Sequence, residues 1–322
     1  MTEQVFWFFA AVAVVSAGLV VAMRNPIASA FWLVSTMLCL AAMFFLLNAQ
    51  FIGVVQILVY AGLAPFLLAV LLPLVWMVIT AFKHERDLYA MRFPLWFHEP
   101  PTLKHFHLLF TQTWFGTWVV NTALVSACVV VITVVTAVPA AYALARLRLP
   151  GAGNLGIALF MTYLVPPIVL FLPLTYVVAR LGLMDSWWAL VLVYPTFTIP
   201  FCTWLMAAFF RTVPLEIEEA AWIDGCGVAG GLLRVVLPLS LPGIVTTAIF
   251  AFTLSMQDYL YAVVLSSPVE QKVITVGLST MLIRGDIFFW GSLMAGALLV
   301  GVPTALVFNL VLDRFVRGLT GS

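Results

Sequence analysis

Few side chains in this sequence have the types and spacing that catalysis or metal binding requires. The 4 histidines lie in one polar segment, as His84, His98, His105 and His107. Zinc sites usually take their ligands from closely spaced residues in a defined framework, and only the pair at positions 105 and 107 is closely spaced here. We therefore expect a solvated loop that contacts a partner protein, and no metal site.

A glycine-rich motif at residues 151–156, GAGNLG, matches the G-x-G-x-x-G pattern of dinucleotide sites. That pattern binds nucleotides where a strand precedes it and a helix follows it within a βαβ unit. Here it follows RLRLP and opens an apolar run, and the sequence contains no G-x-x-x-x-G-K-[ST] phosphate-binding loop. We predict no cofactor on this chain, no catalytic residues and no enzymatic activity.

The composition indicates a protein that is surrounded by lipid. Hydrophobic residues make up 64% of the 322 residues, charged residues make up 8%, and the mean hydropathy is +1.16. A soluble domain carries about 25% charged residues, so this chain cannot cover itself with a polar surface. The net charge of +1 also argues against a nucleic-acid partner, which requires a basic face.

Apolar runs near the roughly 20 residues that a bilayer-spanning helix needs predict an all-α polytopic membrane protein. Two prolines, Pro65 and Pro73, interrupt the third run. The first run follows MTEQ, which has an acid and no Lys or Arg, so we expect a retained helix rather than a signal peptide. The predicted helices cover residues 4–23, 28–47, 54–80, 115–144, 155–178, 187–210, 242–264 and 289–312.

The distribution of positive charge does not decide the orientation in the membrane. Arg146 and Arg148 directly follow one run, and Arg314 and Arg317 follow the last. Such short, sharply placed pairs favour the cytoplasmic side. The loops on the opposite side, however, carry a similar number of Lys and Arg residues in total.

One polar interruption, at residues 211–241, predicts two short helices joined by a bend. Pro214 suits the first position of a helix, and the acids that follow it suit the positive end of the helix dipole. Gly225 allows the chain to bend. Residues 227–236 then predict a second, amphipathic helix, which the prolines from Pro238 onward would end.

This predicted helix pair has the character of a docking element. Ala220 and Ala221 keep one face thin, so another helix or surface can approach it closely. Two Arg against three Glu and one Asp give residues 211–241 a net charge of −2, whereas helices that lie on lipid headgroups are usually basic. We therefore expect the loop to face another protein rather than the headgroups.

The spacing of the residues in this loop resembles the EAA loop of permease subunits of binding-protein-dependent ABC importers. The family usually has Ile where this sequence has Val235, and its carbohydrate branch has the Asp-Gly pair seen at residues 224–225. Residues 83–110, 121–147, 181–204 and 257–265 also resemble that branch, closest to its maltose-type subunit, and the resemblance extends over about residues 64–322. The residues that match the coupling motif are Glu219, Ala220, Ala221, Asp224, Gly225, Val235, Leu237 and Pro238.

This resemblance implies a six-helix permease core in a bacterial inner (cytoplasmic) membrane and the import of a sugar or an oligosaccharide. The EAA loop and the C-terminus would be cytoplasmic, and the loop would dock on a separate ATPase that binds ATP-Mg. The implied partners are a second permease subunit, an ABC ATPase dimer, an extracytoplasmic solute-binding protein and the sugar substrate.

Polar residues within the apolar runs are candidates for the substrate path, because intramembrane polar groups are costly unless they serve a function. Gln257, Asp258 and Tyr259 stand where the family has its Asn-Asp/Glu-Tyr motif, and Asn121 and Tyr163 are further candidates. Asp258 either lines or gates the path, or makes a hydrogen bond that packs helices together. The partner permease can supply most of the sugar contacts in this family.

The first part of the sequence resembles a different family. Residues 24–62 resemble the start of subunit J of the proton-pumping NADH–quinone oxidoreductase. We therefore predict an N-terminal two-helix segment at residues 1–62, added to a permease domain at residues 63–322.

Two alternative functions follow from this second resemblance: a membrane subunit of the proton pump, or a non-functional fusion of the two proteins. Proton translocation needs buried ionisable residues in series. Residues 1–82 offer only Glu3 and Arg24, so the sequence favours the permease function.

Overall fold

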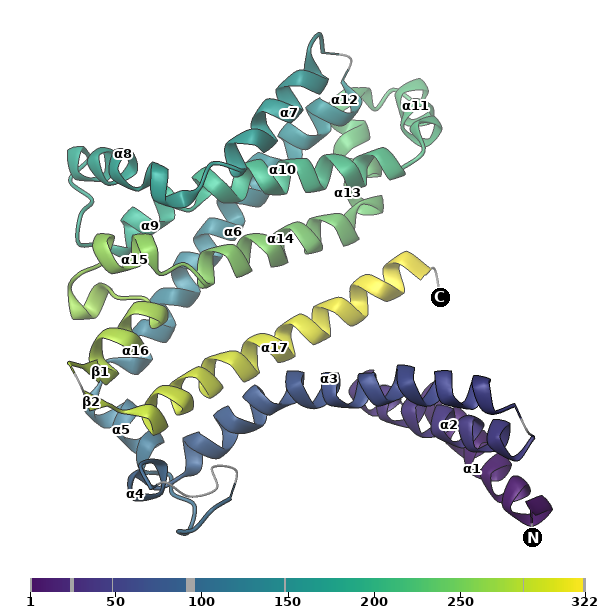
Figure 1. Ribbon diagram of the computed structural model, residues 1–322. Coiled ribbons are helices and arrows are strands. Elements are labelled where there is room, and N and C mark those ends of the chain that lie inside the picture. The colour runs from purple at the N-terminus through teal and green to yellow at the C-terminus, as the bar shows by residue number, and fades with distance from the viewer. Residues whose placement is uncertain are drawn as a thin grey trace. The chain divides into compact units, whose positions relative to one another are not determined.

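The computed structural model describes residues 2–23, 26–47, 49–90, 96–147, 149–285 and 287–320, and these are almost entirely helical (Figure 1). The chain forms two compact units, Met1–Ile79 and Thr80–Ser322, and each is described by itself. Two residues that the sequence analysis used, Arg24 among the ionisable residues of the first helices and Arg148 in the distribution of positive charge, lie outside the described residues. The predicted all-α membrane fold is confirmed.

The N-terminal unit begins with a helical hairpin. Helices α1 (Thr2–Ala22) and α2 (Pro26–Leu46) run antiparallel and pack along their lengths. The hydroxyls of Ser16 and Ser35 lie 3.3 Å apart in a hydrogen bond, and Ser29 Oγ donates to the Val20 carbonyl at 2.7 Å. Small side chains allow two membrane helices to approach this closely.

The third helix, α3 (Gln50–Phe82), is continuous over 33 residues. The predicted helix at residues 54–80 is confirmed, and its helical backbone continues through Pro65 and Pro73. A proline removes one backbone donor from a helix, and a membrane helix can tolerate that loss. The boundary between the two compact units falls inside this helix.

The C-terminal unit is built around α6 (Phe115–Arg146), which packs against α10 (Pro195–Thr212) and α14 (Leu241–Met256). Helix α9 (Trp187–Val193) precedes α10 directly, and α17 (Trp290–Thr320) packs against α14. Apolar clusters fill the spaces between these helices, and the largest includes Leu190 of α9 and Tyr194, which lies between α9 and α10.

Two of the predicted spans are broken. Residues 155–178 were predicted as one helix but form α7 (Ala152–Tyr163) and α8 (Pro167–Arg180), which meet at 89°. Pro166 and Pro167 explain the break, because the residue before a proline avoids the helical region and a proline favours the first helical turn. Residues 242–264 form α14 and α15 (Leu260–Leu265), separated at residues 257–259.

Among the described residues, 4 helices are long and apolar enough to cross a membrane, or up to 6 if each bent pair counts as one span. The bent pairs are α7 with α8, and Gly227–Leu239 with α14, which meet at 78°. These lengths fit a multi-pass membrane protein.

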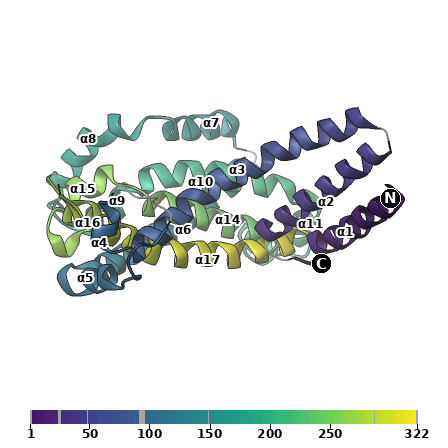
Figure 2. The same ribbon diagram turned by 60° about the horizontal axis from the view of Figure 1, so that its bottom comes forward.

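The two ends of the C-terminal unit carry different elements, as Figures 1 and 2 show. At one end lie α11 (Leu215–Ile223), α12 (Gly227–Gly231) and α13 (Leu237–Leu239). The opposite end gathers the remaining short elements. They are α4 (Glu85–Leu88), α5 (Lys104–Gln112), the 3-10 turn Val269–Gln271, α16 (Ile274–Leu282) and the two-stranded hairpin of β1 (Ile283–Arg284) and β2 (Ile287–Phe288).

Candidate functional site

The loop at residues 211–241 contains the predicted pair of short helices. Helix α11 begins at Leu215, directly after Pro214, and ends at Ile223. Gly225 has φ +84° and Gly227 has φ +61°, and both values lie in the left-handed region that favours glycine. The predicted bend at Gly225 is therefore confirmed.

The second half of the loop differs from the prediction. Pro238 does not end the second helix, because α12, a π-helical turn at Leu232–Val236 and α13 form one run to Leu239. Pro238 closely follows the π-helical turn within this run, and local π adjustments are one way in which a helix accommodates a proline. The chain turns only at Ser240, before α14.

The coupling motif divides between an exposed and a buried face. Glu219, Ala220 and Asp224 are exposed, whereas Ala221 is buried with 8% of its surface exposed. The prediction that both alanines face outward therefore holds for Ala220 alone, since neighbouring helical positions point in directions about 100° apart. Among the other motif residues, Gly225 and Pro238 are exposed, and Val235 and Leu237 are half-buried.

Sequence reasoning missed one functional candidate in this loop, Glu218. Its side chain has no exposed surface and lies against Tyr142 and Arg146, near the C-terminal end of α6. The available signal was the tyrosine and arginine four residues apart at the end of an apolar helix, because that spacing puts both polar groups on one face.

The carboxylate of Asp258 binds groups of its own protein. Its Oδ2 atom accepts hydrogen bonds from the Tyr194 hydroxyl at 3.0 Å and from the backbone N–H groups of Tyr261 and Ala262 at 3.1 and 3.2 Å. The backbone bonds satisfy donors at the N-terminus of α15, as a capping carboxylate does. This geometry fits the helix-packing alternative for Asp258.

The other path candidates occupy three different settings. Asn121 is buried, and its Nδ2 atom donates to the carbonyls of Glu270 and Lys272 at 2.7 and 2.9 Å. The ring of Tyr163 lies 4.9 Å from that of Phe201 between centroids. Gln257 and Tyr259 are exposed, so their polar groups are accessible.

Two cavities lie among α6, α14, α16 and α17. The larger, of about 930 Å³, is lined by apolar side chains from α6, α13, α14 and α17, including Val130, Ile249 and Phe308. The smaller, of about 350 Å³, has polar groups in its lining, among them Gln257, Thr275 and Thr304. Most of the surface that lines either cavity is apolar, whereas a sugar needs hydrogen-bonding groups together with apolar contact, so neither lining identifies a sugar site by itself.

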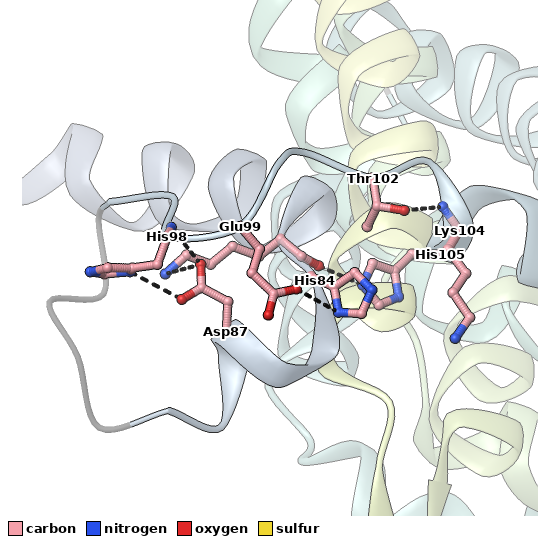
Figure 3. A network of polar contacts seen from close by, with 8 residues as sticks. His84, Asp87, His98, Glu99, Thr102, Lys104 and His105 are labelled. Atoms are coloured by element: carbon pink, nitrogen blue, oxygen red, sulfur yellow. Dashed lines mark hydrogen bonds and ion pairs between the residues drawn. The ribbon is translucent and has the colours of Figure 1, made fainter.

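Three of the four histidines, His84, His98 and His105, lie in a network of polar contacts at the opposite end (Figure 3), whereas His107 is exposed. His98 binds Asp87 through its ring and its backbone N–H, at 3.0 and 3.1 Å, and His84 Nδ1 lies 3.3 Å from Glu99 Oε2. His105 is buried and its Nε2 atom lies 2.8 Å from the Lys83 carbonyl.

The prediction that this segment is a solvated loop is therefore wrong for His105, because His105 packs beneath α17. Its Nδ1 atom lies 3.3 Å from Ser292 Oγ. No group of three or more His, Cys, Asp or Glu residues able to hold a metal occurs in the part of the chain that the structure describes.

The pKa of the Asp87 carboxyl is lowered from its ordinary value. The hydrogen bond from the His98 backbone N–H is the largest cause, and the charges of Lys83 and His98 act in the same direction, against the opposing effect of burial. Asp87 is thus held as an anion by its neighbours.

Comparison with known protein families gives two matches. Residues 137–320 match the sequence model of the binding-protein-dependent transport system inner membrane component, and residues 16–184 match that of NADH-ubiquinone/plastoquinone oxidoreductase chain 6. Both resemblances found in the sequence are thus present.

The similar proteins of known name favour the transport family over the oxidoreductase family. A sulfoquinovosyl glycerol transport system permease protein of Agrobacterium fabrum is 33% identical, and the match covers 78% of this chain and 88% of the relative. An inner membrane ABC transporter permease protein of Escherichia coli is 31% identical, with 82% and 94% covered.

A third relative and a solved structure agree. A maltodextrin transport system permease protein of Bacillus subtilis is 34% identical over 76% of this chain and 88% of its own. The crystal structure of a bacterial ABC transporter for the import of alginate has the same fold, with a TM-score of 0.70, 20% identity, and coverage of 83% of this chain and 98% of its own. The proton-pump alternative is not favoured, and the chain belongs to the family of binding-protein-dependent transport system inner membrane components, which are transport proteins rather than enzymes.

Proposed function

We propose that this chain is the permease subunit of an ATP-driven importer whose substrate is a sugar or an oligosaccharide. The observation that carries the proposal is the helical loop at residues 215–239, which presents Glu219, Ala220 and Asp224 on its exposed surface. The relatives named for sulfoquinovosyl glycerol and maltodextrin transport, and the alginate importer, support the substrate class.

The loop would dock on a separate ATPase, since residues that are small or exposed allow a partner to approach closely. The proposed assembly contains this chain, a second permease subunit, an ABC ATPase dimer that binds ATP-Mg, and an extracytoplasmic solute-binding protein. Closure of the ATPase dimer would move α11, and the permease would expose its substrate site to each side of the membrane in turn.

The proposed docking role also implies an orientation of the chain in a bacterial inner membrane. An ATPase supplied with ATP by the cytoplasm can reach the loop only from that side, so α11 and the C-terminus would be cytoplasmic. The end that carries α4, α5 and α16 would then face outward, where the solute-binding protein arrives.

For the substrate path, we propose the region around the break between α14 and α15, beside the smaller cavity. Gln257 offers an exposed amide, and Thr253 and Thr275 lie in the same lining. Tyr259 is also exposed beside this break. Asp258, Asn121 and Tyr163 would support the path by packing, given the contacts that each one makes.

Copurification and uptake test the assignment. The tagged chain, expressed together with the other proteins encoded beside it, is expected to retain an ABC ATPase and a second permease. Proteoliposomes of that assembly are expected to accumulate a sugar when ATP and the binding protein are present. Retention of respiratory subunits instead would contradict the proposal.

Cys226 provides a test of the orientation. It is half-buried at the bend of the loop, whereas Cys39 and Cys202 are buried in helices and Cys128 is half-buried within the long apolar helix α6. A membrane-impermeant thiol reagent is expected to label Cys226 in inside-out vesicles and not in right-side-out vesicles, because a thiol reacts only where the reagent reaches it. Bound ATPase should protect it, and labelling from outside would contradict the orientation.

A further inference from the structure

A buried charge connects the docking loop to the long helix α6. The side chain of Glu218 on α11 has no exposed surface, and that of Arg146, in the last turn of α6, is 7% exposed. Arg146 Nε lies 3.5 Å from Glu218 Oε2, and the Tyr142 hydroxyl donates a hydrogen bond to Glu218 Oε1. Tyr142 and Arg146 are four residues apart, so they share one face of α6.

Further contacts strengthen this connection. Arg146 Nη2 donates a 2.5 Å hydrogen bond to the carbonyl of Val213, so one guanidinium holds both Glu218 and the backbone that enters α11. The Tyr142 ring packs edge-on against Phe210, with centroids 6.0 Å apart, and Val236 is fully buried in the same apolar cluster. The loop is therefore fixed to α6 and α10 by polar and apolar contacts together.

Helix α12 encloses the other side of the carboxylate. A Cβ atom at Gly231 would lie 2.9 Å from Trp222 Nε1 and 3.6 Å from Glu218 Cγ, so α12 and α11 approach too closely for a larger residue. A buried charge that loses its partner is strongly destabilising. Any movement that separates Glu218 from Arg146 is therefore opposed.

The other half of α6 holds the segment at residues 269–274. Trp118 Nε1 donates to the Val269 carbonyl at 2.8 Å, and Asn121 Nδ2 donates to two carbonyls further along the segment. Thr122 Oγ1 accepts from the backbone N–H of Ile274 at 2.8 Å. The two sets of contacts are separated by 20 residues of α6 at the nearest, from Thr122 to Tyr142, which is about 30 Å at about 1.5 Å per residue.

We propose that Glu218, Tyr142 and Arg146 form a rigid joint through which α11 and α6 move as one body. Helix α6 then carries the movement of the docking loop to the segment at residues 269–274, at the opposite end of the unit. Glu218 is a positioning residue in this scheme, because it points into the protein while Glu219 points outward. The joint rests on the proposed function, since it needs an ATPase that moves α11.

Three variants in the assembled importer test the joint. Glu218→Gln keeps the shape of the side chain and removes its charge, Tyr142→Phe removes one hydroxyl, and Glu216→Gln is a matched control at an exposed position of α11. Each assembly is placed in proteoliposomes with its binding protein. ATPase copurification, ATP hydrolysis and sugar uptake are measured for each.

We expect the Glu218→Gln importer to retain its ATPase and to hydrolyse ATP, while the sugar taken up per ATP falls about tenfold. Tyr142→Phe is expected to change this ratio in the same direction by less, and Glu216→Gln is expected to match the parent. A residue that only stabilised the fold would lower the amount of assembled importer and leave the ratio unchanged.

A distance measurement tests the rigidity directly. Spin labels are attached to Glu216→Cys on α11 and Val135→Cys on α6, both exposed positions, in a Cys226→Ser background. The distance between the labels is expected to be the same without nucleotide and in an ATP-trapped state. In the Glu218→Gln importer the distribution is expected to broaden.

Two results would each contradict the proposed joint. One is a distance between the labels on α11 and α6 that changes when ATP binds. The other is a Glu218→Gln importer that takes up as much sugar per ATP hydrolysed as the parent does. If that variant fails to accumulate in the membrane, the ratio measured for Tyr142→Phe decides, because that change preserves the ring packing. If the parent chain itself retains no ATPase, the proposed function is contradicted, and so is the joint, because the joint needs that ATPase.

Discussion

The two ends of the C-terminal unit use their charged residues in opposite ways. At the α11–α13 end, Glu219 and Asp224 are exposed and a single acid, Glu218, is buried against Arg146. At the α4–α5 end the acids bind neighbours within the same segment, with Asp87 between Lys83 and His98 and Glu99 beside His84.

This difference separates an end at which paired acids support the local fold from an end at which exposed acids are available to the proposed ATPase. Acids that bind neighbouring cations support the local fold, and little of their charge is left for recognition. Exposed acids on a short helix add little stability, and their charge can contribute to recognition of a partner. Substitutions at the two ends should therefore affect different properties.

The largest effect is expected at the bend of the loop. Gly225 has φ +84°, and no heavy atom lies within 4 Å of the place where its Cβ would be. Gly225→Val therefore acts through the backbone alone, at a cost of about 1–3 kcal/mol. We expect normal membrane insertion, and loss of both ATPase copurification and sugar uptake.

Gly225→Asn is the matched control for the bend, because asparagine tolerates the left-handed conformation better than other side chains. It should keep most of the copurification and the uptake. Unchanged transport in the valine variant would contradict the docking role of the bend.

A smaller effect, on stability alone, is expected at the opposite end. A Cβ at Gly291 would lie 2.3 Å from Nε2 of the buried His105. Gly291→Ala is expected to destabilise the protein by about 1–3 kcal/mol, measured as a lower Tm of the purified chain in detergent. Gly116→Ala, where nothing lies within 4 Å of the added atom, should leave Tm nearly unchanged.

The comparison predicts that Gly291→Ala protein that remains folded still binds its ATPase. If this variant lost the ATPase at temperatures where it is folded, the functional separation of the two ends would be wrong.

A still smaller effect is expected from pH at Asp87. Its pKa in the folded protein is lowered from the ordinary value of 3.8. The stabilisation of the fold by ionised Asp87 is therefore complete at pH values above the pKa of this carboxyl in the unfolded chain. It is lost as the pH falls through the lower pKa that the carboxyl has in the folded protein. We expect the difference in Tm between the parent and Asp87→Asn to be constant above about pH 5 and to shrink in more acidic buffer.

A difference in Tm that grew on acidification would contradict this assignment. Glu85→Gln, on the first turn of the same short helix, serves as the control for the general effect of removing one acid.

No effect on transport is expected from removing the first helices. We propose that residues 63–322 form the permease domain and that residues 1–62 are an added segment. Deletion of residues 1–50, with a starting Met supplied, should leave sugar uptake at the level of the full chain. Failure of the shortened chain to assemble with the ATPase would make α1 and α2 part of the permease fold.

The sequence was sufficient for the helical class, the family and the bend at Gly225, because apolar run length and glycine position act locally. It did not predict the 89° break between α7 and α8. The two prolines there are compatible with either a kinked span or two helices. The packing of neighbouring helices decides between a kinked span and two helices, and that packing cannot be inferred from the residues of one apolar run.

Within the loop, sequence reasoning treated Glu216, Glu218 and Glu219 as equivalent acids at the positive end of a helix. The structure separates them, since Glu218 alone turns inward to Tyr142 and Arg146. Those partners lie more than 70 residues earlier in the chain, so the pairing depends on the tertiary fold. For Asp258, the sequence left two roles open, and the hydrogen bonds to α15 fit one of them.

The hairpin of α1 and α2 has a consequence for how such a chain can arise. Its two helices are held together by their own contacts, including that between Ser16 and Ser35. A hairpin whose two helices both cross the membrane returns the chain to the side on which it began. A gene that gains or loses such a hairpin by recombination keeps the direction of every later crossing, whereas the gain of a single helix would invert them all. Hairpins of this kind can therefore be exchanged between unrelated membrane proteins without reversing the topology of either.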